Sequence, residues 1–130
     1  MSDSSVIAPD KALRVATTVL LLRDGAAGME IFMVQRHHQI EFASGALVFP
    51  GGKSHVGDAD PDWGRHASGW DGLDPGQRIL RVAAIREVFE ETGILLAQGR
   101  DGSPFAGTVD PGERTAVDRG DLPFLDVIRS

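Results

Sequence analysis

The feature that most constrains this chain is a helix signal that begins at Asp74 and ends at Gly93. Aspartate often caps helix N-termini, Pro75 suits the first helical turn, and Gln77 follows at the capping-box spacing. Glycine is typical of a helix end, where one residue adopts a left-handed backbone conformation. The sequence therefore predicts a helix over residues 77–92.

This helix has two opposed faces, because each residue advances about 100° around an axis with 3.6 residues per turn. The apolar arc consists of Val82, Ile85 and Phe89. The acidic arc consists of Glu87, Glu90 and Glu91. We expect the apolar arc to pack against a sheet. The small residues Ala83 and Ala84 flank the acids, which predicts an opening for a bulky anionic group.

The acidic arc is costly on its own. Carboxylates at these spacings repel one another by about 0.2–0.5 kcal/mol per close pair. Their place near the negative end of the helix dipole adds about 0.3–1 kcal/mol for each group. Divalent Mg²⁺ or Mn²⁺ would offset both costs, and Arg86 would orient one carboxylate. A glutamate-rich face by itself is more typical of a solvated surface, so the metal hypothesis depends on the surrounding pattern.

Three strands are expected before the helix. Val15 to Leu22 and Met29 to Gln35 are rich in aliphatic and β-branched residues and flank a glycine-containing turn, which predicts a hairpin. Ala46 to Phe49 predicts a third strand. Pro50 and the pair Gly51-Gly52 then favour a tight turn at its end.

One domain accounts for the whole length of 130 residues. We expect a flexible tail over 1–14 and a domain over 15–130, with a polar, glycine-rich surface insertion at about 53–74. Within it, Asp58, Asp60 and Asp62 resemble the start of a calcium loop, but Trp63 replaces its glycine and a solvated turn is favoured. After the main helix, we expect a strand at 94–97, a loop at 99–107 and an amphipathic helix at 122–129.

Composition excludes several classes of function. Lys plus Arg number 13 against 19 for Asp plus Glu, and the net charge of −6 disfavours a nucleic-acid partner. The absence of cysteine excludes disulfides, thiolate nucleophiles and cysteine-based zinc sites. With no long apolar run and no basic leader, a cytoplasmic protein without membrane contact is expected.

The segment Arg86-Glu87-Val88-Phe89-Glu90-Glu91-Thr92-Gly93-Ile94 resembles the second half of the box that defines the Nudix hydrolases, and all seven specified positions match. The upstream Phe49-Pro50-Gly51-Gly52 fits the strand end before that box, and the resemblance covers about residues 15–97. It implies an α/β fold, a Nudix-like α/β/α sandwich with a mixed sheet.

The same resemblance implies a metal-dependent hydrolase that cleaves a diphosphate linkage by attack of a metal-activated water. Glu87, Glu90 and Glu91 would bind Mg²⁺ (or Mn²⁺) together with the backbone carbonyl of Gly51, and Arg86 would hold one glutamate. Gly51 and Gly52 would also line the substrate site. The general base is not assigned, and Glu90 or a group beyond the box is a candidate.

Two departures from the family pattern bear on the substrate. Asp58 stands where the box has glutamate, and the interval from Gly52 to Arg86 is 34 positions (86 minus 52), about 20 more than in the family. Such insertions resemble the branch related to coenzyme A diphosphatases. An upstream motif of that branch is matched by Arg36 and Gly45 but not by His37 and Glu41.

The substrate therefore stays open. Arg36 is a candidate phosphate ligand, with a surface charge as its alternative. We expect a nucleotide-type small molecule, with coenzyme A or acyl-coenzyme A and another nucleoside diphosphate derivative as alternatives.

Only 37 residues (130 minus 93) follow Gly93, and they contain little strand-like sequence. The sandwich of the family needs further strands there, so its C-terminal side is expected to be incomplete, and a homodimer would cover the exposed sheet. Two hypotheses follow: an active diphosphohydrolase, or a catalytically deficient Nudix fragment that binds metal or nucleotide.

Overall fold

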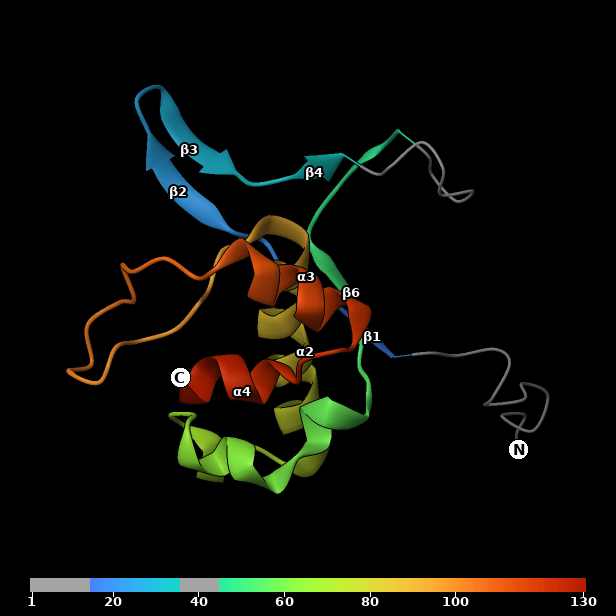
Figure 1. Cartoon of the computed structure of the whole chain (residues 1–130). Helices are drawn as coiled ribbons and strands as arrows, with labels where there is room; N and C mark the ends of the chain where they lie inside the picture. Colours follow the sequence, from blue (N-terminus) through green and yellow to red (C-terminus); the bar gives the residue numbers. More distant parts are fainter. Residues whose placement is uncertain (1–14, 36–44) are drawn as a thin grey trace, which may run out of the picture.

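The computed structural model describes residues 15–35 and 45–130 (Figure 1). Its strands form two-stranded antiparallel pairs. The pairs are β1 (Ala16–Thr18) with β6 (Gly51–Lys53), β2 (Leu22–Gly25) with β3 (Gly28–Ile31), and β4 (Val34–Gln35) with β5 (Leu47–Val48). A parallel pair, which the expected mixed sheet would need, is absent from these described segments.

The hairpin is confirmed, but its first strand begins later than predicted. β2 and β3 pair from Leu22 opposite Ile31 to Gly25 opposite Gly28. Figure 1 shows them as a bent blue hairpin. The earlier part of the predicted strand forms β1, which pairs with β6 instead. The aliphatic run is thus shared between two sheets, which a propensity pattern does not reveal.

The tight turn predicted at Gly51-Gly52 is wrong, because both residues lie in β6. A side chain on Gly51 would place its Cβ 2.1 Å from the carbonyl oxygen of Thr17. Glycine is therefore needed here because β1 passes very close to β6.

The main helix is confirmed as α2 (Pro75–Thr92). The Asp74 carboxylate accepts a hydrogen bond from the Gln77 amide at 2.8 Å, and Gly93 ends the helix with φ of 79°. Val82 and Phe89 are buried and Ile85 is half-buried against them, as the apolar arc predicts. Within the described residues, no helix is long and apolar enough to cross a membrane.

The region 53–74 packs more closely than a surface insertion would. It contains three short 3-10 helices, η2 (Val56–Ala59), η3 (Pro61–Arg65) and η4 (Trp70–Gly72). Trp63 is buried, and its indole N–H donates to the carbonyl of Gly57 at 3.1 Å. Its ring lies 5.6 Å from that of Phe124, so this region joins the core.

Two further helices follow α2. The predicted helix at 122–129 is confirmed as α4 (Phe124–Arg129), with Leu125 buried. α3 (Pro111–Arg119) was not predicted. The strand expected at 94–97 is not formed, and this stretch leads instead to an isolated bridge between Gln98 and Pro104.

The core therefore lies among helices rather than between sheet and helix. Its buried members are Trp63, Val82, Phe89, Val117, Phe124, Leu125 and Val127. By contrast, the hairpin exposes apolar side chains such as Leu22 (55%) and Met29 (68%). The strands β1 and β6 contact α2 directly, and β6 brings the glycine pair beside Glu87 and Glu91 of its acidic face.

Candidate functional site

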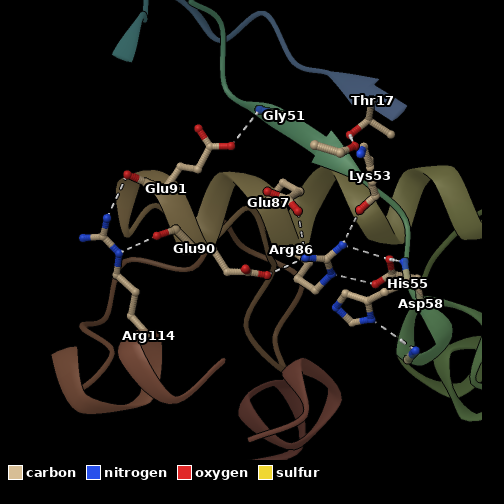
Figure 2. Close-up of polar contacts among 12 residues, drawn as sticks. Thr17, Gly51, Lys53, His55, Asp58, Arg86, Glu87, Glu90, Glu91 and Arg114 are labelled. Atoms are coloured by element: carbon tan, nitrogen blue, oxygen red, sulfur yellow. Dashed lines mark hydrogen bonds and ion pairs between the residues drawn. The ribbon is translucent and has the colours of Figure 1, made fainter. Parts of the chain in front are cut away.

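Arg86 is the centre of the polar contacts on α2, and only 2% of it is exposed (Figure 2). Its Nε and one terminal nitrogen donate to the two carboxylate oxygens of Asp58, at 2.8 and 3.0 Å. The same terminal nitrogen donates to the carbonyl of Lys53 at 2.9 Å. The other donates to Glu87 at 3.0 Å and to Glu90. Arg86 therefore orients two glutamates, where the sequence predicted one.

Asp58 is the partner that sequence reasoning undervalued. It is 1% exposed and accepts a further hydrogen bond from the His55 amide at 2.9 Å. The 3-10 helix η2, capped by His55, brings it to Arg86 across 28 positions of sequence. The available signal in the sequence was the spacing of Asp58 from Gly52. In the structure, Asp58 and Arg86 form a bidentate ion pair, and such charge-assisted hydrogen bonds are among the strong ones.

The calcium-loop alternative finds no support in these contacts. Asp60 caps η3 by accepting from the Asp62 amide at 2.9 Å, and Asp62 accepts from Arg129 at 2.6 Å. Each aspartate of the alternating series thus has a different partner, and the three carboxylates do not converge on one point.

Charge compensation around Arg86 is strong. Burial of the guanidinium acts to lower its pKa, but the hydrogen bonds that it donates to Asp58 and Glu90, with their negative charges, more than offset this, so the pKa of Arg86 is raised. A guanidinium with a raised pKa stays positively charged near neutral pH.

The glycine pair of β6 lies against the acidic face. The Gly51 amide donates to a carboxylate oxygen of Glu91 at 3.2 Å. A Cβ on Gly52 would lie 2.4 Å from the carboxyl carbon of Glu87. Figure 2 shows both carboxylates on the strand side of α2. The structure therefore brings together the predicted residues Gly51, Gly52, Glu87 and Glu91.

The carboxyl groups at this face are desolvated and crowded. Burial raises the pKa of Glu87, which Arg86 opposes and neighbouring Glu91 reinforces. Burial likewise raises the pKa of Glu90, again against Arg86, with the charges of Glu87 and Asp118 adding to the rise. A cation placed among these groups would lower both pKa values and relieve the repulsion.

Comparison with known proteins identifies relatives of this chain. No protein-family model matches the chain. It is 28% identical to the acyl-coenzyme A diphosphatase NUDT19 of Xenopus laevis, over 57% of this chain and 27% of that protein. It is 30% identical to the crystal structure of a Nudix hydrolase from Alicyclobacillus acidocaldarius, with a TM-score of 0.62 over 83% of this chain.

The chain is related to the Nudix hydrolases. Coenzyme A diphosphatases are among these relatives, which confirms the branch expected from the insertion. The α/β, Nudix-like fold class is confirmed as well. The chain spans 50% of the solved neighbour and 27% of the curated relative.

The described residues fit the divalent metal of the Nudix family by donor type. The carboxylates of Glu87 and Glu91 lie on one side of α2 and offer the hard oxygen atoms that Mg²⁺ and Mn²⁺ prefer, whereas the Gly51 contact seen here is its amide N–H donating to Glu91. Within the described segments, however, no group of three or more His, Cys, Asp or Glu side chains surrounds a common point. Glu90 is turned toward Arg86 instead, so the assignment of the metal ligands stays a prediction.

Two other expectations about the candidate site have different outcomes. Arg36, with His37 and Glu41, lies outside the described residues. Ala83 is fully buried, so the opening predicted beside the acids is wrong at this residue. Its small side chain lets neighbouring residues pack closely around the helix, and no space for an anion remains beside it.

Arg114 of α3 was missed by sequence reasoning. Its guanidinium donates to the backbone carbonyls of Glu90 and Glu91 at 2.9 and 2.8 Å. The available signal was the helix start Asp110-Pro111 and the stop Gly120, which together frame α3. The sequence around Arg114 gives no sign of which carbonyls its guanidinium binds, because they lie 23 and 24 positions away.

Proposed function

We propose that the chain is a diphosphohydrolase that depends on Mg²⁺ or Mn²⁺ and cleaves a nucleoside diphosphate derivative, with coenzyme A or acyl-coenzyme A as the first candidate. The observation that carries this proposal is the acidic face of α2, where Glu87 and Glu91 lie against Gly52 and Gly51. The name of the curated relative supports testing acyl-coenzyme A first.

Each residue at this face has a task under the proposal. Arg86 orients the carboxylates of Glu87 and Glu90, and Asp58 keeps Arg86 in place. Glycine in β6 leaves space beside the Glu87 carboxyl, where a side chain would collide. When bound, the divalent ions would supply positive charge to the diphosphate and acidify the attacking water.

The reaction adds water across the linkage. The water oxygen bonds to one phosphorus, the bond from that phosphorus to the bridging oxygen breaks, and two phosphate monoesters leave. Glu90 is the candidate acceptor of the water proton, because burial raises its pKa toward the range where a base works at neutral pH. Its hydrogen bond from Arg86 acts against this role.

A second candidate function is a module that binds metal or nucleotide without turnover. It is favoured by the orientation of Glu90 toward Arg86 and by the absence of a converging carboxylate group within the described residues.

One experiment separates the two functions. The purified chain is incubated with Mg²⁺ or Mn²⁺ and with coenzyme A, acyl-coenzyme A, ADP-ribose, NADH and nucleoside triphosphates, and products are identified by mass spectrometry. We expect hydrolysis that is lost on chelation and in Glu91→Gln and Glu87→Gln.

The matched control is Glu30→Gln, which removes a carboxylate from the exposed hairpin pair with Arg23 and should keep full activity. Full activity in both site variants would refute the proposed enzyme. Binding of nucleotide without any product would establish the second candidate.

A further inference from the structure

The last turn of α2 needs partners for its carbonyl groups. The final four carbonyls of a helix have no N–H donor within the helix, so they accept hydrogen bonds from water, a cap or another side chain. Here the carbonyl of Phe89 accepts from the Gly93 amide at 2.9 Å. The next two carbonyls belong to Glu90 and Glu91, whose side chains form the acidic face.

Both carbonyls are bound by one side chain. Arg114 Nε donates to the Glu90 carbonyl at 2.9 Å, and a terminal nitrogen donates to the Glu91 carbonyl at 2.8 Å. Figure 2 shows the guanidinium at the backbone of this turn, away from the carboxylates. A Cβ on Gly93 would lie 3.4 Å from Arg114, so the guanidinium also packs on the helix stop. The planar guanidinium group has several N–H donors in fixed directions, which suits the two adjacent carbonyl acceptors.

We propose that Arg114 is a positioning residue for the metal-binding carboxylates. By holding the carbonyls of Glu90 and Glu91, it keeps the last turn of α2 helical and thereby sets the direction of both side chains. The inference rests on the proposed function, because that function requires a divalent cation at the acidic face of α2. Arg114 itself touches neither metal nor substrate.

Charge alone predicts the opposite effect on metal binding. A guanidinium close to the site repels a cation, so its removal would tighten binding if charge were its only contribution. Removal of a positioning contact instead loosens the turn and weakens binding. Loss of such supporting contacts costs about 10–100-fold in metal affinity in other sites. Tighter metal binding after removal of Arg114 would therefore indicate charge repulsion, and weaker metal binding would indicate positioning.

The test measures Mn²⁺ and Mg²⁺ binding by isothermal titration calorimetry without substrate. We expect Arg114→Ala to weaken binding about tenfold, the low end of that range. Arg114→Lys keeps the charge but cannot span both carbonyls, so it should recover only part of the affinity. The control Arg119→Ala removes an exposed arginine near the end of the same helix and should bind as the unchanged chain does. Equal or tighter binding by Arg114→Ala, or full recovery by Arg114→Lys, would overturn the proposal.

Hydrogen exchange of the metal-free chain gives a second measurement that needs neither metal nor activity. Amides of residues 90–93 should exchange faster in Arg114→Ala and Arg114→Lys than in Arg119→Ala, while those of residues 79–84 stay unchanged. Unchanged exchange at 90–93 would refute the positioning role. A chain that binds no divalent cation would contradict the proposed function, and exchange would still decide whether Arg114 holds the turn.

Discussion

Replacement of Asp58 by alanine tests the buried ion pair that fixes the acidic face. Asp58 and Arg86 are 1% and 2% exposed, and two hydrogen bonds of 2.8 and 3.0 Å join them. Removal of one partner from such a pair costs about 3–5 kcal/mol, because the other charge stays buried. Arg86 keeps its contacts to Lys53, Glu87 and Glu90, so the lower end, about 3 kcal/mol, applies.

This loss is a large part of the total stability, since domains unfold at a cost of about 5–15 kcal/mol. For a chain of this size it corresponds to a fall in Tm of roughly 10 °C. Urea unfolding followed by tryptophan fluorescence measures it, because Trp63 is buried in the same region and loses its environment on unfolding.

Two variants make the reasoning refutable. The exposed pair Arg23–Glu30 provides the control, and Glu30→Ala should cost no more than about 1 kcal/mol. The double variant Asp58→Leu with Arg86→Met removes both charges and should regain much of the stability. A loss of less than about 1 kcal/mol in the free energy of unfolding for Asp58→Ala would show that this ion pair does not fix the position of Arg86 and the acidic face.

Three other outcomes are expected. Gly52→Ala places a Cβ against the flexible carboxyl of Glu87, so hydrolysis should fall steeply while the unfolding midpoint in urea changes little. Burial raises the pKa values of Glu87 and Glu90, so the folded state favours their protonated forms. Without metal, the free energy of unfolding should therefore decrease as pH rises from about 4.5 through the raised values, and Glu87→Gln should flatten this slope in urea titrations. Met29→Lys on the exposed apolar hairpin should reduce self-association of the proposed homodimer in sedimentation velocity, and an unchanged distribution would exclude this surface as the interface.

Local signals were sufficient to predict α2. The Asp74 cap, the Gly93 stop and the spacing of Val82 and Phe89 all act within a few residues, so no tertiary information was needed. The hairpin β2–β3 was predictable for the same reason. Most of the acidic face followed from the periodicity of this one helix.

Contacts between distant segments were not predictable from such signals. Gly51 and Gly52 have turn-forming residue types, but their role depends on how closely Thr17 and Glu87 approach them. Arg114 lies 23 and 24 positions from its acceptors, in a helix whose caps are visible but whose neighbours are not. Sequence patterns identify an element more readily than they identify what it packs against.

The arginines change one conclusion drawn from the acidic arc. Its repulsion and unfavourable dipole placement were expected to need a divalent cation. In the structure, Arg86 binds the side chains of Glu87 and Glu90, and Arg114 binds the last carbonyls of the helix. The protein therefore has two positive charges of its own, one at the carboxylates that repel one another and one at the negative end of the helix dipole.

It follows that metal should be needed for chemistry and not for folding. We expect the chain treated with EDTA to unfold cooperatively, with a native near-ultraviolet circular dichroism spectrum. Added Mg²⁺ should raise stability only by its binding to the folded state, about 1 kcal/mol at a few times the Kd. Loss of the near-ultraviolet signal on chelation would show that the two arginines do not suffice, and that the acidic face requires metal to fold.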